Sequence, residues 1–320
     1  MDPLSQVLSL LKIRSVLSAR FEGYGEWAMC FPAYRHIKFG GVLEGSFKLW
    51  SEGSSVPVDL EAGDFYLLTD GSPYCSATTL ERKPVDGKLI FETHRGADGK
   101  VRYGRSGKKV VVAGGRFTFD DASSDLLLQQ LPAVIHIPSA SDIAAPLKAV
   151  LGLLATETET VRPGFDVSAA SIANIVLVQI LRAYVATGPQ PPGWLSAIGD
   201  ARIGNALKLM HDDLTRRWTV EELAVAAGMS RTAFNQRFKI LVGSPPLHYL
   251  LHWRMTVARD ELRKGGSLSR IAEAVGYSSD TAFNSAFKRI TGKSPGQYRL
   301  QEQVRESATE LFAESEKSSN

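Results

Sequence analysis

The chain of 320 residues is poor in several features that mark other classes of protein. Its two cysteines, Cys30 and Cys75, are too few for a disulfide framework and fit a reducing compartment. No uninterrupted apolar run approaches the roughly 18 residues of a membrane span, and the N-terminus carries Asp2 in place of a basic leader. The sequence therefore predicts a cytoplasmic protein that is neither exported nor inserted into a membrane.

Clustered metal ligands and catalytic groups are also lacking. The sequence contains no CxxC motif and no His or Cys residues at metal-ligand spacing, so we expect no metal and no cofactor. An enzyme needs acid, base or nucleophilic groups that converge on one place. The candidates for such groups are scattered along the first half of the chain: His36, Glu44, Tyr74, Cys75, His94 and His136. We therefore expect no catalytic site.

Positive charge is concentrated in one segment. Residues 201–300 carry 16 Lys and Arg against 8 Asp and Glu, whereas residues 1–200 carry 19 against 21. An excess of this kind is typical of proteins that neutralise the phosphates of nucleic acid, although solvated basic faces are also common. Charge alone favours a nucleic-acid partner without establishing it.

The first part of the chain combines strand-like and helical sequence patterns. From residue 27 to about residue 119, short runs of β-branched and aromatic residues alternate with turn formers, which predicts a β-barrel or sandwich. Helical spacing follows in residues 144–155 and 167–185, so this first domain, 1–186, contains helices from about residue 141. The apolar faces of these helices have two suitable partners, the sheet or a second subunit.

A change in composition and periodicity marks a second domain. Residues 187–199 include Thr187-Gly-Pro-Gln-Pro-Pro-Gly193 and predict a linker. Residues 200–301 have helical spacing, and residues 302–320, rich in Glu and Ser, predict a disordered tail. The expected architecture is multidomain, with an N-terminal β-barrel or sandwich carrying helices and a C-terminal all-α domain.

The helical part contains an internal repeat. The segment Leu223-Ala-Val-Ala-Ala-Gly-Met-Ser230 returns 48 residues later as Ile271-Ala-Glu-Ala-Val-Gly-Tyr-Ser278, and after a one-residue insertion the offset becomes 49. In each copy a short amphipathic helix ends at glycine, Gly228 or Gly276, and a second helix follows. This is the order of a helix-turn-helix unit, which binds in the major groove of DNA.

The pattern separates buried from exposed positions in each unit. We expect Ser230 and Ser278 to cap the second helices. The expected cores of the two units consist of apolar residues with the turn glycines: Leu223, Ala224, Gly228, Phe234, Phe238, Ile271, Ala272, Gly276, Phe283 and Phe287. The opposite faces present polar groups that suit base edges and phosphates: Arg231, Thr232, Asn235, Gln236, Lys239, Asp280, Thr281, Asn284, Ser285 and Lys288.

A single helix is expected between the two units. Residues 246–264 begin with proline and end at Gly265-Gly266. At about 1.5 Å per residue this helix spans roughly 28 Å, close to the roughly 34 Å of one DNA turn. Two second helices held this far apart can enter successive major grooves on one face of double-stranded DNA.

Longer motifs surround the repeat, and they carry a family resemblance. The motifs are Trp218-Thr-Val-Glu-Glu-Leu-Ala, Ala227-Gly-Met-Ser-Arg-Thr-Ala-Phe, Trp253-Arg-Met, Ile271-Ala-Glu-Ala-Val-Gly-Tyr-Ser and Phe287-Lys-Arg-Ile-Thr-Gly-Lys-Ser-Pro-Gly-Gln-Tyr-Arg299. With them, residues 207–298 resemble the DNA-binding domain of AraC-type (AraC/XylS) transcription regulators. The resemblance implies promoter DNA and RNA polymerase as partners, and activation more than repression. Many relatives carry arginine where this chain has Ser285, so the first unit is expected to supply more base-specific contacts.

The first half of the chain is similar to the cupin-like sensor domain of one subgroup of that family. The similarity rests on Val42-Leu-Glu-Gly45, Leu60-Glu-Ala-Gly-Asp64, Gly114-Gly-Arg-Phe-Thr-Phe-Asp120 and Leu131-Pro-Ala-Val-Ile-His136. It implies an unidentified small-molecule effector or a homodimer. Metal-binding cupins carry an HxH pair and a later histidine, whereas this chain has His36-Ile-Lys-Phe-Gly and Gly71-Ser-Pro-Tyr74. The resemblance therefore implies no metal site.

These observations predict a sequence-specific DNA-binding transcription regulator in which an effector acts on residues 1–186. Two alternatives from other classes stay open. One is a cupin-type enzyme with a DNA-binding appendage, which the scattered candidate groups argue against. The other is an architectural protein that binds DNA without sequence preference, which a sensor-like first domain argues against.

Overall fold

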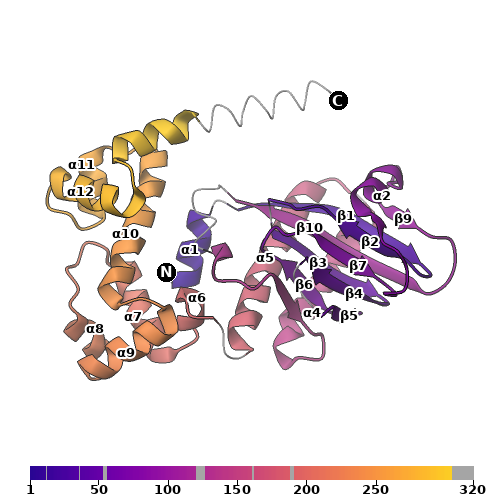
Figure 1. The fold of residues 1–320 in the computed structure, drawn as a ribbon, viewed down its shortest axis with the longest axis horizontal. Coiled ribbons are helices and arrows are strands. Elements are labelled where there is room, and N and C mark those ends of the chain that lie inside the picture. Colours follow the sequence, from indigo (N-terminus) through magenta and orange to yellow (C-terminus); the bar gives the residue numbers. More distant parts are fainter. Residues whose placement is uncertain are drawn as a thin grey trace. The chain divides into compact units, whose positions relative to one another are not determined.

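A computed structural model of the chain describes residues 1–11, 13–35, 37–52, 56–119, 127–160, 162–187 and 191–304 (Figure 1). Contacts within the chain define two compact units. One comprises residues 11–190, and the other comprises residues 1–10 together with residues 191–320. The expected first domain began at residue 1, whereas the first ten residues lie in the helical unit. Of the predicted disordered tail, 302–320, only residues 302–304 are described, and they continue a helix that begins at residue 295.

The first unit is built on two β-sheets. The six-stranded sheet has the order β11 (Val134–Ile137), β6 (Phe65–Leu68), β3 (Ile37–Glu44), β10 (Lys109–Thr118), β1 (Arg14–Tyr24) and β9 (Val101–Tyr103). The five-stranded sheet has the order β5 (Val58–Glu61), β4 (Ser46–Ser51), β7 (Tyr74–Ala77), β2 (Ala28–Phe31) and β8 (Val85–Asp86). The predicted β-sandwich is confirmed.

Apolar and polar residues alternate along the strands, so one face of each sheet is apolar and packs against the other sheet. Val42 and Leu68 from the six-stranded sheet share one apolar core with Phe47 and Leu49 from the five-stranded sheet. Gly40 lies where a Cβ atom would come within 2.4 Å of the Tyr66 ring. The missing side chain at this position allows the Tyr66 ring to lie over β3.

Helices cover the outer face of the six-stranded sheet (Figure 1). After η1 (Asp142–Ala144), α4 (Ala145–Glu159) and α5 (Phe165–Ala186) follow as the spacing predicted, while α2 (Gly87–Thr93) packs near β2. By length and composition, α5 is apolar enough to cross a membrane. Its buried residues, including Ile172, Val176 and Ile180, are those of a core helix, because α5 packs against α4 and β1.

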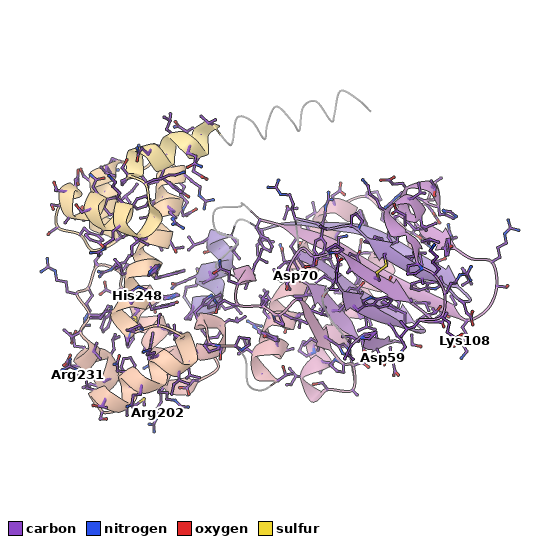
Figure 2. All side chains as sticks on the ribbon, in the orientation of Figure 1. Asp59, Asp70, Lys108, Arg202, Arg231 and His248 are labelled. Atoms are coloured by element: carbon purple, nitrogen blue, oxygen red, sulfur yellow. A yellow bond between two sulfur atoms is a disulfide. The ribbon has the colours of Figure 1, made fainter. Side chains whose placement is uncertain are left out.

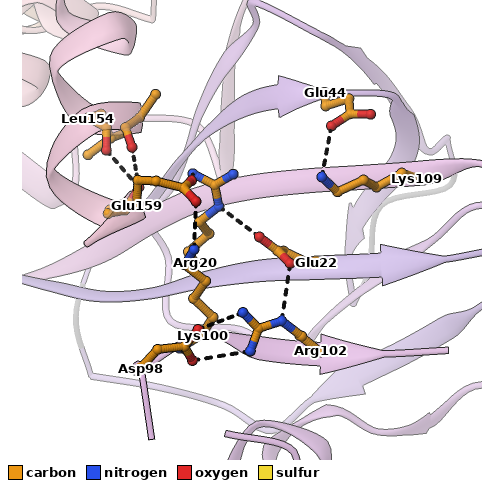
Figure 3. A network of polar contacts seen from close by, with 11 residues as sticks. Arg20, Glu22, Glu44, Asp98, Lys100, Arg102, Lys109, Leu154 and Glu159 are labelled. Atoms are coloured by element: carbon orange, nitrogen blue, oxygen red, sulfur yellow. Dashed lines mark hydrogen bonds and ion pairs between the residues drawn. The ribbon is translucent and has the colours of Figure 1, made fainter. Parts of the chain in front are cut away.

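A network of ion pairs fastens the end of α4 to the sheet (Figure 3). Arg20 Nε lies 3.1 Å from Glu22 Oε1, and Arg102 Nε lies 3.3 Å from Glu22 Oε2. Lys100 Nζ lies 2.8 Å from Glu159 Oε1, and Arg20 also pairs with Glu159. Glu22 and Lys100 are both buried, and each charge has a partner, as buried charges require.

The two cysteines form a disulfide within the five-stranded sheet (Figure 2). Cys30 on β2 and Cys75 on β7 are directly paired in the antiparallel register, with their Cα atoms 4.0 Å apart. The sequence predicted no disulfide framework, and this single disulfide corrects that expectation. The pairing of strands 45 residues apart brings the sulfur atoms together, and cysteine count says nothing of register.

The helical unit consists of α1 (Pro3–Leu10), α6 (Trp194–Ala197), α7 (Ala201–Asp212), α8 (Val220–Ala226), α9 (Arg231–Val242), α10 (Pro246–Arg263), α11 (Leu268–Ala274) and α12 (Asp280–Thr291). The N-terminal helix α1 packs on α7, and Gln6 Nε2 donates to Asp212 Oδ1 at 3.0 Å. In the predicted linker, 187–199, α6 buries Trp194 and Leu195 and packs against α9. The end of that segment is therefore folded.

Candidate DNA interface

The first helix-turn-helix unit is formed by α8 and α9. Thr219 caps α8 with a reciprocal capping box, because its hydroxyl accepts from Glu222 N while Glu222 Oε2 accepts from Thr219 N at 2.8 Å. Hydrogen bonds from Arg216 and Thr219 lower the pKa of Glu222 to about 2. Gly228 then turns the chain with φ +62°, which favours glycine, and Ser230 caps α9 as predicted.

The second unit, α11 and α12, repeats this geometry with one difference. Gly276 has φ +82°, and a Cβ atom there would lie 2.6 Å from Leu214 O. The cap of α12 is Ser279, whose Oγ accepts from Ala282 N at 3.2 Å, and not Ser278 as predicted. The reason is the extra residue in this turn, since position 279 stands 49 residues after Ser230.

Each unit has its own apolar core. Phe234 and Phe238 are completely buried in the first unit, with ring centroids 5.6 Å apart, and Phe283 and Phe287 repeat this arrangement in the second. The other predicted apolar core residues are also buried: Leu223, Ala224, Ile271 and Ala272. The remaining two predicted positions, Gly228 and Gly276, form the turns and are not buried.

The outward face of α9 is polar and open. All five predicted residues are exposed: Arg231, Thr232, Asn235, Gln236 and Lys239. The Arg231 side chain is 69% exposed (Figure 2). Its Nη1 atom lies 2.7 Å from Glu221 Oε1 on α8. A surface ion pair of this kind is weak, so Arg231 exchanges it readily for another anionic partner.

Fewer of the predicted contact residues are exposed on the outward face of α12 than on that of α9. Thr281, Ser285 and Lys288 are exposed, but Asp280 and Asn284 are half-buried. Asp280 also accepts a hydrogen bond from Ser269 Oγ at 2.7 Å. This face therefore offers one predicted cation, Lys288, where α9 offers two.

Helix α10 joins the two units (Figure 1). It runs as a single helix from Pro246 and ends before Gly265, as predicted. Arg254 on this helix donates to Leu214 O at 2.9 Å and to Arg216 O at 2.8 Å. Arg254 thus binds the loop between α7 and α8 through two backbone carbonyls.

Two basic residues on the second helices were not among the predicted contacts. Arg237 on α9 binds Asp200, the N-cap of α7, with Nε 2.9 Å from Oδ2. Arg289 is exposed on α12 beside Lys288. Arg237 directly follows Gln236, and Arg289 directly follows Lys288. A search of the sequence for basic residues next to the predicted contact positions would have found both.

The described residues among those considered for catalysis have separate partners. His136 Nε2 lies 2.8 Å from Asp64 Oδ2, His94 shares a hydrogen bond with Thr93, and Glu44 pairs with Lys109. Cys75 is in the disulfide, Tyr74 lies beside Lys38, and His36 lies outside the described residues. Within the described part of the chain, no group of three His, Cys, Asp or Glu side chains could hold a metal ion.

Comparisons with known proteins agree with both units. A cupin family model matches residues 2–186, and a helix-turn-helix domain model matches residues 223–301. A putative AraC-like transcription regulator of Streptomyces lividans is 40% identical over 88% of this chain and 92% of its own length. The regulator AlkR of Acinetobacter baylyi is 30% identical over 88% of this chain and 93% of its own length.

A solved structure with DNA is also similar. The DNA-binding domain of AdpA in complex with a target DNA is 33% identical, with a TM-score of 0.30, and covers 31% of this chain and 91% of that domain. The relatives named here are transcription regulators and not enzymes, in agreement with the expectation from the sequence.

Proposed function

The chain belongs to the AraC family of transcription regulators, with an N-terminal cupin domain and a C-terminal helix-turn-helix domain, and on this premise we propose that it activates promoters under the control of a small-molecule effector. It is a sequence-specific DNA-binding regulator. The observation that carries the proposal is the pair of helix-turn-helix units, each with an exposed polar face, joined by the single helix α10.

We assign the base contacts mainly to α9. Arg231, Asn235 and Gln236 are exposed side chains of the types that hydrogen-bond guanine and adenine edges. Thr232 and Lys239 suit phosphates. On α12, Thr281, Ser285 and Lys288 would contact the second groove, with Asp280 and Asn284 at its edge. Because α10 has 18 residues, it spans roughly 27 Å at about 1.5 Å per residue, which supports contact with successive major grooves.

The effector, the polymerase and the oligomeric state belong to the same proposal. An effector acting on the cupin domain changes promoter binding only if it binds one arrangement of the protein better than another. RNA polymerase is the partner that resemblance to AraC-type activators implies. A homodimer would place two such double units on one promoter. The site of action is the cytoplasm, where bacterial promoters are.

Selection of binding sites from random duplex DNA by the full-length protein tests the proposal. We expect enrichment of a motif with two patches one helical turn apart, roughly 10 base pairs. The patch read by α9 should carry more information than the patch read by α12, since α9 presents Arg231 and Gln236 where the repeat places Asp280 and Ser285 on α12.

A matched pair of variants sharpens this selection. Arg231→Ala should change the α9 patch alone, and Ser285→Ala should change the α12 patch alone. Binding that depends on salt but enriches no motif would favour an architectural role and contradict the proposal. A motif left unchanged by both variants would contradict the assignment of base contacts.

A further inference from the structure

A lysine from the six-stranded sheet of the cupin domain lies among three aromatic rings. Lys38 is on β3 of the six-stranded sheet, and its Nζ lies 4.7 Å from the ring centroid of Tyr74 and 5.4 Å from that of Phe31, which belong to the five-stranded sheet. The Tyr34 ring is 4.8 Å away. Nζ also donates to the Tyr74 hydroxyl at 3.2 Å. We call Lys38 with these three rings the aromatic cage.

Among the described residues, the charge of Lys38 has no acidic partner. Partial burial, followed by the nearby Arg116, lowers the pKa of Lys38 to about 8. Arg116 on β10 is paired with Lys38 in the antiparallel register, so the two side chains leave the same face of the sheet. In the described part of the chain, neither cation has a carboxylate within ion-pair distance. Two neighbouring cations without a counter-ion form a site that favours an anion.

An apolar cavity adjoins the cage. Phe31 and Tyr74 belong to the cage and also line a cavity of about 70 Å³ between the sheets. Its other walls are mostly aromatic and aliphatic: Phe21, Trp27, Met29, Phe47, Leu49, Tyr66, Ser76, Phe91 and Val112. Trp27 is 2% exposed, and its Nε1 atom has no hydrogen-bond partner in the described structure. Buried polar groups normally have hydrogen-bond partners, so the Trp27 N–H is a donor that a ligand in this cavity could satisfy.

The chemistry of the site selects one class of ligand. A cation would be repelled by Lys38 and Arg116, and a neutral apolar molecule would leave both charges unpaired. Inorganic phosphate could pair with both cations, but it has no apolar part to fill the cavity. An ion with one negative charge and an apolar body satisfies both parts of the site.

We propose that the effector is a small carboxylic acid, whose carboxylate binds between Lys38 and Arg116 and whose apolar part enters the cavity beyond Phe31 and Tyr74. This inference rests on the proposed effector control of the regulator. It adds the class of the effector and the residues that recognise its charge.

Calorimetric titration of the full-length protein with two acids and their amides tests the inference. Butanoate and benzoate carry a short chain and a single ring, and butanamide and benzamide have the same shapes without the charge. We expect at least one acid to bind and its amide to bind at least roughly tenfold more weakly. Trp27 lines the cavity, so its fluorescence should change with the acid.

Two lysine-to-methionine substitutions distinguish the contribution of the cage lysine to acid binding from that of a lysine outside the cage. Lys38→Met keeps an unbranched side chain and removes the cation, so it should lose at least roughly tenfold in acid affinity. Lys48→Met is the matched control, because Lys48 lies on β4 and pairs with Asp59. It should bind the acid as the wild type does. The midpoint of thermal unfolding shows that each variant is folded.

The outcomes are distinct. The inference is overturned if neither acid binds, if acid and amide bind equally, or if folded Lys38→Met binds the acid with unchanged affinity. Promoter affinity measured with and without acid reports on the proposed function separately. Binding through Lys38 with no effect on promoter affinity would uphold the ligand class and contradict effector control by it. A promoter response to another ligand that persists in Lys38→Met would uphold effector control and overturn the inference.

Discussion

His211 on α7 and Trp253 on α10 stack face to face, with ring centroids 4.0 Å apart and planes within 8° of parallel. His211 Nε2 and the Tyr249 hydroxyl share a hydrogen bond of 2.7 Å. These contacts tie α7, which packs against α8 and α9, to the helix α10 that joins the two helix-turn-helix units. Burial lowers the pKa of His211 to about 3, against a smaller opposite effect of Asp212, so the imidazole is neutral in the folded protein.

The buried imidazole makes stability depend on pH. The folded-state pKa of His211 lies below its unfolded value of about 6.5, so the stabilisation is complete above that value and falls as the pH decreases. From pH 6.5 to pH 5 we expect the free energy of unfolding of the helical unit to fall by about 2 kcal/mol through this residue. Denaturant titrations at several pH values measure it. His211→Phe should reduce the slope, whereas His94→Phe, at an exposed position in the cupin unit, should keep it; equal slopes in all three proteins would contradict the assignment.

Each helix-turn-helix unit should lose stability when a residue of its own core is truncated. Phe234→Ala and Phe283→Ala each remove a fully buried ring from a different core, so each should cost about 3–5 kcal/mol and abolish promoter binding. Ile240→Ala is the control, because Ile240 lies on α9 with 70% of its surface exposed and should change stability by less than about 0.5 kcal/mol. Unchanged thermal stability of Phe234→Ala would refute the core assignment.

Arg231 should act on DNA with little effect on folding. Arg231→Ala removes an exposed ion pair worth at most about 1 kcal/mol of stability, but it should weaken promoter binding by about 1–3 kcal/mol. Glu221→Gln releases Arg231 from its partner and should leave promoter affinity equal or higher. Gel-shift titrations compare the three proteins. Loss of affinity in Glu221→Gln equal to that in Arg231→Ala would mean that the ion pair itself matters, and not the free guanidinium.

The disulfide should stabilise the cupin unit. Cys30 and Cys75 are 45 residues apart, and closing a loop of that size is expected to contribute about 4 kcal/mol by restricting the unfolded chain. Reduction should therefore lower the midpoint of thermal unfolding of the sandwich, followed by tryptophan fluorescence, to which Trp27 and Trp50 of this unit contribute. The double variant Cys30→Ser, Cys75→Ser should reproduce the reduced protein and no longer respond to reductant. A response that persists in the double variant would show that the shift does not come from this bond.

The sequence predicted the helical unit more fully than the sandwich. Phe234, Phe238 and Gly228 follow from helical spacing and turn chemistry, which act over a few residues. A local error, Ser278 for Ser279 as the cap of α12, arose where a single inserted residue shifts the cap. Arg254 is different, because its partners Leu214 and Arg216 are about 40 residues away, and no local pattern indicates a packing role.

By itself, the sequence determined the family, the β-sandwich and the repeated helix-turn-helix, because these depend on periodicity, turn residues and motif order. Only the tertiary structure decided that Cys30 meets Cys75, that α1 packs on α7, and that Lys38 lies among Tyr34, Phe31 and Tyr74. These relationships depend on strand register and helix docking between distant segments. A shift of one residue in register would move each side chain to the other face of its sheet, and local composition does not report that choice.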